Sequence, residues 1–199
     1  MITDIFTGSI QLEDERALLR PLTHEDYDLL LPFAIHEPEL WKYSFASPAS
    51  AEGMKEYIEG TMKNKSAKNE YPFVVFDKIN NACAGSTRFY DIQPRNQTAQ
   101  LGYTWYGKKF QRTGLNRHCK FLLLQFAFEQ WGLERVEFRA DVNNARSVEA
   151  MKAIGCTVEG VLRSHLATSF GTRRNSIVLS ILKDEWFGGV RELLKGKLY

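Results

Sequence analysis

The sequence has little of what marks several classes of protein. Of its 199 residues only three are cysteines, Cys83, Cys119 and Cys156, an odd and scattered set without a C-x-x-C pair, which argues against a disulfide framework or a zinc site. No apolar run reaches the roughly 18 residues of a membrane-spanning helix, and the N-terminus has no signal-peptide pattern. We therefore expect a soluble, cytoplasmic protein with no metal and no membrane partner.

An excess of one charge is also missing. The formal net charge is +2 at pH 7, so bulk electrostatics give no reason to expect a nucleic-acid partner. Hydrophobic residues make up 44% of the chain and aromatic residues 13%, which is enough at this length for a sizeable core. No internal repeat or low-complexity tract divides the sequence, and residues 1–199 are predicted to form a single domain.

One stretch departs from this balance. No acidic residue occurs between Asp91 and Glu129, whereas six cations do: Arg95, Lys108, Lys109, Arg112, Arg117 and Lys120. Within it, the loop Q-R-T-G-L-N at 111–116 follows a strand pattern and opens a long apolar helix, Gly114 to Trp131. Helix N-termini favour anions, and glycine lets the backbone approach a ligand closely. The loop can bind a phosphorylated ligand, or it can simply keep a basic surface soluble. A P-loop would need Gly-Lys-Ser/Thr, which is absent.

The remaining patterns predict a chain of mixed helices and strands. Helices are expected from Thr23 to about Ile35, from Ala51 to Lys65, from within D-V-N-N-A-R-S at 141–147 to Gly155, and from Asp184 onward. Strands are expected in a hairpin at 9–20, in a meander at 71–76, 82–90 and 98–106, at 136–140, and at 157–167 and 173–182 around a turn at 169–171. The strand at 136–140 follows the long helix closely enough to complete a βαβ crossover.

Two clusters of residues each allow a purely structural interpretation and a functional one. The acidic residues at the hairpin tip, Glu13, Asp14 and Glu15, could form a catalytic pair, but charge clusters at turns are usually only solvated. A set of aromatic residues could cover the core or could wall a substrate cleft that holds an apolar or cationic group. Its members are Trp41, Tyr43, Phe45, Tyr90 and Tyr103.

Taken together, this order of elements resembles the GNAT acetyltransferase fold, and more closely its ribosomal-protein (RimJ/RimL-like) branch. The resemblance is carried by residues 111–116, 141–147 and G-C-T-V-E-G-V-L-R at 155–163. In the family's pyrophosphate motif, Gln/Arg-x-x-Gly-x-Gly/Ala, Gln111 and Gly114 match and Asn116 replaces the last small residue. This branch often has Asn there and a lysine four residues on, matched by Lys120. The implied α/β (α+β) fold has a mixed, mostly antiparallel sheet flanked by helices and splayed between the strands before the glycine loop and after the long helix.

The resemblance implies acetyl-CoA as co-substrate. The loop would bind the diphosphate through the backbone N–H groups of Gln111, Arg112, Thr113, Gly114, Leu115 and Asn116, with charge supplied by Lys108, Lys109, Arg112 and Arg117. The main chain around Trp105 and Tyr106 would pair with the pantetheine arm, and a backbone N–H there would stabilise the oxyanion.

Asn144 and Ser147 match the family's N-x-x-S and lie three residues apart, on one face of a helix. By resemblance, Asn144 would hold a pantetheine amide and Ser147 the departing sulfur. Alternatively, Asn144 only caps its helix and Ser147 is a polar residue of the first turn.

The predicted activity is direct acetyl transfer to a primary amine, at a protein N-terminus or on a small amine such as a polyamine, amino acid or antibiotic. A base must deprotonate that amine, and the sequence does not identify it. Glu159 lies in the family's E-G-x-L-R motif but can equally have a structural role. Asn175 stands where relatives commonly have aspartate.

Three further expectations stay open. The fold could serve as a non-catalytic acyl-CoA-binding or regulatory module, or, less favoured, the basic loop could bind RNA. A homodimer is possible because the C-terminal leucines Leu193, Leu194 and Leu198 could pack on a partner.

Overall fold

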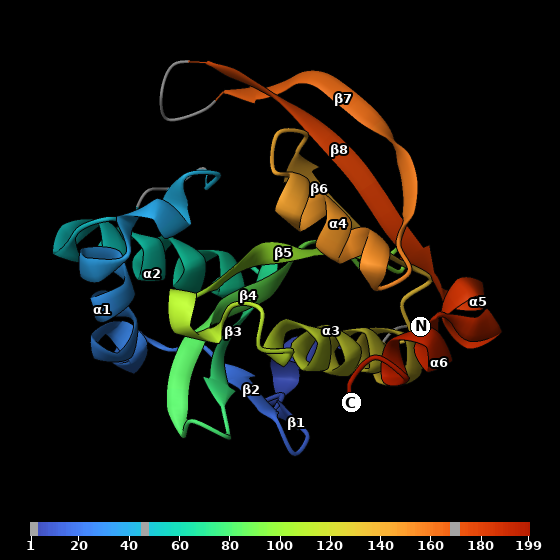
Figure 1. Cartoon of the computed structure of the whole chain (residues 1–199), viewed down its shortest axis with the longest axis horizontal. Coiled ribbons are helices and arrows are strands. Elements are labelled where there is room, and N and C mark those ends of the chain that lie inside the picture. The colour runs from blue at the N-terminus through green and yellow to red at the C-terminus, as the bar shows by residue number, and fades with distance from the viewer. Residues whose placement is uncertain (1–3, 45–47, 168–171) are drawn as a thin grey trace.

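One mixed sheet runs through the residues that the computed structural model describes, 4–44, 48–167 and 172–199. Its strand order is β1-β2-β3-β4-β5-β6-β8-β7, and every neighbouring pair is antiparallel except β5 and β6, which are parallel (Figure 1). The strands are β1 (Leu12–Glu13), β2 (Ala17–Pro21), β3 (Glu70–Asp77), β4 (Ala82–Gln93), β5 (Thr98–Tyr106), β6 (Arg135–Asp141), β7 (Thr157–Ala167) and β8 (Arg173–Leu182). The predicted mixed, mostly antiparallel sheet is confirmed.

Helices connect these strands. The α-helices are α1 (Tyr27–His36), α2 (Ala51–Ser66), α3 (Leu115–Gln125), α4 (Ala145–Ala153), α5 (Lys183–Glu185) and α6 (Arg191–Lys195). Short 3-10 turns are η1 (Ile5–Thr7), η2 (His24–Asp26), η3 (Pro38–Trp41) and η4 (Lys108–Phe110), and π-helical turns are η5 (Phe126–Trp131) and η6 (Trp186–Val190). The long helix predicted over 114–131 is therefore α3 continued by η5, and it ends at Gly132 with φ 85°. The terminal helix is interrupted at Gly189, where φ is 145°.

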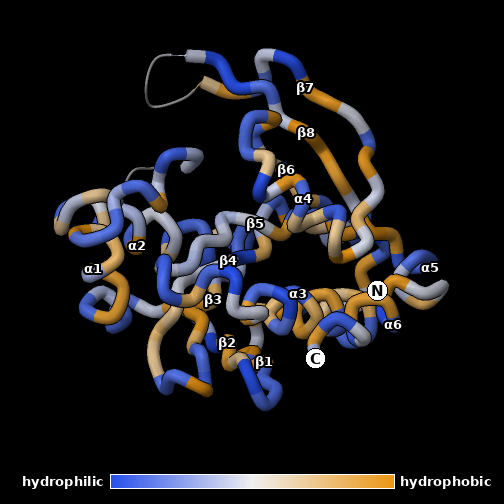
Figure 2. Tube along the Cα trace, in the orientation of Figure 1, coloured by the Kyte–Doolittle hydropathy of each residue, from blue (hydrophilic) through white to orange (hydrophobic). Residues whose placement is uncertain are grey.

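The two faces of the sheet have separate cores because side chains alternate along each strand. On one face, Leu30 of α1 and Met54 of α2 pack with Val74 of β3. On the other face, α3 packs against Phe73 and Phe138. The apolar residues of α3 follow helical spacing, and Figure 2 shows orange, hydrophobic stretches within α3 and along part of β8. α4 lies beside α3 near β6, so two helix N-termini face the same end of the sheet (Figure 1).

The sheet opens between its two parallel strands. β5 and β6 are paired only from Thr98↔Arg135 to Gln100↔Glu137. Beyond these residues β5 stays on β4 as far as Tyr106, and β6 stays on β8 as far as Asp141. The predicted splay is therefore present, and it leaves two facing strand edges without a ladder partner.

Glycine is required where β4 meets the open part of β5. A Cβ on Gly85 would stand 2.0 Å from the carbonyl oxygen of Trp105, and its φ is +154°. The β4–β5 register shifts between Ser86 and Arg88, and Tyr103 opposite this shift has φ 49°, which marks a β-bulge. The bulge bends β5 as it leaves β6.

The acidic tip of the N-terminal hairpin is not simply solvated. Asp14 accepts hydrogen bonds from the N–H groups of Arg16 and Ala17 at 2.8 and 2.7 Å. Its other oxygen lies 2.7 Å from Nδ1 of His118, whose Nε2 is 3.2 Å from the Leu198 carbonyl oxygen. Asp14, Glu15 and His118 have ligand-type atoms within 4.8 Å of one another, but both ring nitrogens already contact the chain. The cluster connects the hairpin, α3 and the C-terminus.

The C-terminal segment also packs on its own chain. Leu194 is fully buried and Leu198 packs against the same core, whereas Leu193 is 48% exposed. The three leucines therefore do not form a shared surface, which removes the reason given above for a homodimer. Across the described ranges, no helix has both the length and the apolarity to span a bilayer.

Candidate active site

A cavity of about 1110 Å³ lies where β5 and β6 diverge. Its wall is formed by η3, the ends of β5 and β6, the loop before α3 and the start of α4. Cofactor and ligand pockets occupy roughly 300–1,000 Å³, so this cavity is large enough for an extended ligand. The chemistry of its wall changes from one end to the other.

At one end, the loop at 111–116 is held by side chains at both of its sides. Gln111 donates from Nε2 to the Tyr106 carbonyl at 2.7 Å, and Thr113 donates to the Phe110 carbonyl at 2.8 Å. Arg146 of α4 donates to Gln111 Oε1 at 2.7 Å. The loop is thus fixed to the end of β5 and to α4.

The backbone of this loop leaves most of its N–H groups without a partner among the described residues. Arg112 and Gly114 have positive φ values, 62° and 91°, and α3 begins at the next residue. The N–H groups of Arg112, Thr113, Gly114 and Asn116 make no hydrogen bond to any part of the chain that the structure describes. The Leu115 N–H is only 3.5 Å from the Thr113 hydroxyl oxygen. Unpaired donors at the start of an 11-residue helix are suited to binding an anion.

Cations around the loop are fewer than its composition indicates. The Lys108 ammonium pairs with Glu39, and the backbone N–H of Lys108 donates to Glu37 Oε2 at 2.7 Å. Lys109 lies over the Phe110 ring. Acidic residues remote in sequence thus reach the basic loop, and the charges left to line the cavity there are Arg112, Arg117 and Arg146.

The two residues expected to contact the pantetheine arm can do so only through their main chains. The Trp105 side chain is buried under α1 and α2, edge-on to Trp41 with ring centroids 4.9 Å apart. The Tyr106 side chain is buried in the α3 core. Because their strand has left β6, this length of β5 offers an open edge toward the cavity.

Asn144 and Ser147 lie across the gap from that edge, and both line the cavity. Asn144 Oδ1 accepts a hydrogen bond from the Ser147 N–H at 3.1 Å, so the capping interpretation is observed directly. The cap occupies one oxygen of Asn144. Its amide N–H₂ group stays available as a donor, and the Ser147 hydroxyl makes no hydrogen bond within the described ranges. Capping and ligand binding are therefore compatible.

At the other end of the cavity, aromatic residues predominate. Tyr90 and Tyr103 are edge-on with centroids 4.9 Å apart, and the Tyr43 hydroxyl donates to the Asn143 carbonyl at 3.4 Å across the mouth. Trp41 also lines the cavity although it is only 4% exposed, so it serves both core and wall. The structure thus brings together all four aromatic residues predicted to bind substrate. Phe45 lies outside the described residues.

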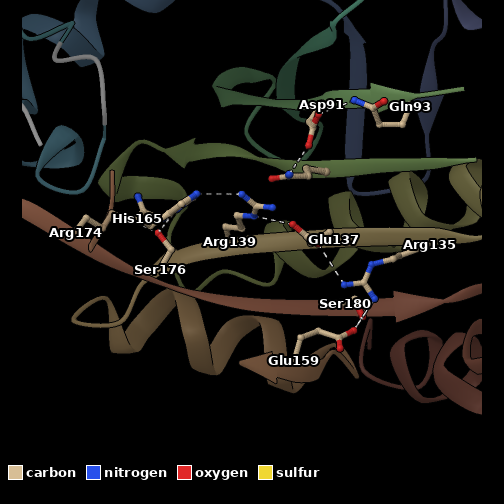
Figure 3. A network of polar contacts seen from close by, with 11 residues as sticks. Asp91, Gln93, Arg135, Glu137, Arg139, Glu159, His165, Arg174, Ser176 and Ser180 are labelled. Atoms are coloured by element: carbon tan, nitrogen blue, oxygen red, sulfur yellow. Dashed lines mark hydrogen bonds and ion pairs between the residues drawn. The ribbon is translucent and has the colours of Figure 1, made fainter. Parts of the chain in front are cut away.

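The same cavity is also lined by members of a polar network that the sequence did not reveal (Figure 3). Arg139 bonds Glu137 at 2.6 Å and His165 at 3.3 Å, and both His165 Nδ1 and Arg174 Nε lie 3.0 Å from the Ser176 hydroxyl oxygen. The residues come from β6, β7 and β8, and they meet because the β7–β8 hairpin arches over the open end of the sheet (Figure 1). In the sequence, the only sign of this polar face is the alternation of side chains along each strand.

His165 is held neutral in this network. Burial lowers the pKa of its imidazole, and the positive charges of Arg139, Arg174 and Arg173 lower it further. An N–H of Arg139 can donate to Nε2 only if that nitrogen is unprotonated, which leaves Nδ1–H to donate to Ser176. On the opposite wall, Asp91 Oδ2 accepts from Gln100 at 2.7 Å. The aromatic end of the cavity therefore contains both a neutral imidazole and a carboxylate.

The two other residues singled out in the sequence lie outside this site. Glu159 bonds Arg135 and the Ser180 hydroxyl, both at 2.5 Å. Asn175 accepts from the N–H of Ser164 at 2.7 Å, beside a bulge in β7. Both contacts stabilise the β6–β8–β7 part of the sheet.

The site thus combines a splayed parallel strand pair, unpaired N–H donors at a helix start and a second, capped helix across the gap. This combination is suited to an enzyme that transfers a group from an extended substrate. The profile of the acetyltransferase (GNAT) domain family matches residues 16–157, and the chain belongs to this family. It is an acetyltransferase.

Individual relatives agree with this assignment. The chain is 26% identical over 180 residues to "Putative ribosomal N-acetyltransferase YdaF" of Bacillus subtilis, covering 88% of this chain and 96% of that protein. A GCN5-related N-acetyltransferase from Brucella melitensis superposes with a TM-score of 0.88 at 23% identity, over 96% and 86% of the two chains. Ribosomal-protein-S5-alanine acetyltransferase of Vibrio fischeri has the same fold, with a TM-score of 0.71 at 21% identity over 89% and 98%. The RimJ/RimL-like branch recognised in the sequence is supported.

Proposed function

We propose that this protein transfers the acetyl group of acetyl-CoA directly to a primary amine. One observation carries the proposal: Arg112, Gly114 and Asn116, whose N–H groups have no partner among the described residues, line the same cavity as the open edge of β5 and the aromatic end. The turn fits a diphosphate, the strand edge fits an amide-bearing arm, and the aromatic end fits an amine-bearing acceptor. The three features occur in the order that acetyl-CoA and its acceptor require.

In this reaction the amine nitrogen attacks the thioester carbonyl, the C–N bond forms, the C–S bond breaks, and CoA leaves as a thiol. The chain would contribute donors: main-chain N–H groups of β5 for the oxygen, and the Ser147 hydroxyl for the sulfur. The amine must arrive deprotonated or lose its proton on the enzyme. Asp91 is a carboxylate at the aromatic end of the cavity that can accept that proton.

The acceptor class is supported by the name of the Bacillus subtilis relative, which refers to ribosomal N-acetylation. A polypeptide N-terminus is therefore the first amine to test, and polyamines and amino acids are the next. The assay is release of free thiol from acetyl-CoA, with each peptide paired with the same peptide carrying a blocked N-terminus. We expect release only with free amines. Tight acetyl-CoA binding without thiol release across the whole panel would contradict the proposal.

Replacement of Ser147 by alanine tests the leaving-group role. Removing a hydrogen bond to a sulfur that gains negative charge should lower kcat about 10-fold. Because the Asn144 cap accepts from the Ser147 backbone N–H, the helix should remain capped and the Kd for acetyl-CoA should change less than about 3-fold. Steady-state kinetics and calorimetry separate the two effects. Ser66→Ala, at the distant end of α2, is the matched control; an unchanged kcat in Ser147→Ala would remove the residue from the reaction.

A further inference from the structure

Lys120 is a buried cation at the point where the sheet opens. It lies in α3, is only 6% exposed, and donates from Nζ to the Thr104 hydroxyl at 3.0 Å. The same ammonium is 5.7 Å from the centroid of the Phe138 ring. Thr104 on β5 and Phe138 on β6 both come after the last paired residues of these strands, Gln100 and Glu137. The ammonium therefore lies between the diverging strands.

Nothing among the described residues neutralises this charge. No carboxylate of residues 4–44, 48–167 or 172–199 forms an ion pair with Lys120. The titratable groups that face it are the thiols of Cys119 and Cys156, and burial raises the pKa of each to about 12, so both stay neutral. A buried ammonium without a counter-ion is costly. Burial accordingly lowers the pKa of Lys120 to about 8.

The surroundings show what the ammonium can bind. Lys120 lines the same cavity as Gly114 and Ser147, and Met151 and Ile154 contribute apolar side chains to that cavity. Of its three N–H donors, one bonds Thr104. Six residues of helix separate it from Gly114, about 9 Å along the axis, so the ammonium lies deeper than the anion site of the turn. It is a buried cationic donor in the wall of the cavity.

We propose that the Lys120 ammonium binds a carbonyl oxygen of the pantetheine–thioester arm of acyl-CoA, in the gap between β5 and β6. The inference rests on the proposed function, because it takes the cavity to hold acetyl-CoA. It assigns to Lys120 a ligand of a stated kind, a neutral carbonyl oxygen rather than a phosphate. The ammonium thereby distinguishes the acylated arm from the nucleotide end of the same molecule.

Because of such a contact, the protein should take up protons when it binds the arm. In the free protein Lys120 is about half protonated at pH 8, whereas a carbonyl acceptor favours its charged form and raises its pKa. Binding should then take up about 0.5 proton per site at pH 8 and about 0.1 at pH 7, because at pH 7 the ammonium is already charged before binding. The nucleotide end alone should cause no such uptake at Lys120.

Isothermal titration calorimetry in two buffers of different ionisation enthalpy measures the number of protons taken up on binding. The ligands are acetyl-CoA and adenosine 3′-phosphate 5′-diphosphate, which has the phosphates but lacks the arm. For Lys120→Met, we expect the proton uptake with acetyl-CoA to disappear and the Kd for acetyl-CoA to rise about 10-fold, with the Kd for the nucleotide unchanged. Lys55→Met, at an exposed position of α2, is the matched control and should behave as the parent protein does.

The outcomes separate the two proposals. If the parent protein binds neither ligand, the proposed function fails. If it binds acetyl-CoA but Lys120→Met keeps the same affinity and proton uptake, only the role of Lys120 fails. An equal loss of affinity for both ligands would assign the ammonium to the phosphates and would also overturn the inference. Thermal denaturation checks folding, and removal of an unpaired buried charge should raise the Tm of Lys120→Met. Lys120→Gln, which keeps an N–H donor but cannot titrate, provides a second variant.

Discussion

Replacement of Gly114 by valine is expected to lower the affinity for acetyl-CoA by about 100-fold or more, because the proposed anion site depends on a backbone conformation that valine disfavours. Gly114 has φ 91° and immediately precedes α3. A β-branched residue at this φ is strained by about 1–3 kcal/mol, and relieving that strain turns the N–H groups of the loop away from a common point. Isothermal titration calorimetry with acetyl-CoA measures the loss.

Steric blockage is not the cause of this effect. A Cβ at position 114 would meet only the guanidinium of Arg117, at an ordinary 3.6 Å. Gly60→Val is the matched control, since Gly60 lies on an exposed turn of α2 with no atom near its Cβ position. The control should bind acetyl-CoA as the parent protein does. A folded Gly114→Val protein with an affinity within about 3-fold of the parent would show that the turn does not hold the ligand.

Replacement of Glu70 by alanine is expected to destabilise the protein by about 3–5 kcal/mol, which corresponds to a fall in Tm of roughly 10 °C. Glu70 and Arg88 form a buried ion pair at 2.5 Å, with side chains 10% and 5% exposed. The Arg88 guanidinium lies 4.4 Å from the ring centroid of Tyr103 and 5.0 Å from that of Tyr57. Loss of the carboxylate leaves this guanidinium buried without its counter-ion. Chemical denaturation gives the free energy of unfolding.

The same variant should weaken the acceptor end of the cavity. Because Arg88 supports Tyr103, which lines that end, the KM for the amine should rise while the Kd for acetyl-CoA stays close to that of the parent. Glu149→Ala removes an exposed i,i+3 pair with Lys152 and should cost no more than about 0.5 kcal/mol.

Changing both members to apolar residues, Glu70→Leu with Arg88→Met, should recover most of the lost stability because no charge is left buried alone. A loss below about 1 kcal/mol in Glu70→Ala would contradict the importance of the pair.

The sequence was most informative where structure is decided locally. Gly114 follows a strand pattern and starts an apolar helix, so a positive φ and a helix start at residues 114–115 could be predicted from neighbouring residues alone. The cap of α4 by Asn144 and its end near Gly155, with φ 97°, are local in the same way. The parallel β5–β6 pair follows from the short distance in sequence between the long helix and the next strand.

What could not be predicted depends on contacts between distant residues. Lys108 has an acidic partner because η3 brings Glu39 beside it, some 70 residues earlier in the chain. Arg146 reaches Gln111 across the cavity, and His165 reaches Arg139 only because the β7–β8 hairpin arches over the sheet. None of these pairs has a spacing that marks it in the sequence. The same holds for the burial of Lys120 between the strands.

The central claim is that the backbone N–H groups at the start of α3 hold the diphosphate of acetyl-CoA. Amide ¹H–¹⁵N spectra of the protein, titrated with adenosine 3′-phosphate 5′-diphosphate, test it most directly because each N–H reports its own hydrogen bond. We predict that the largest downfield shifts occur at Arg112, Thr113, Gly114 and Asn116, whose N–H groups have no partner among the described residues. Saturable binding that leaves these four amides unmoved while amides elsewhere shift would contradict the account.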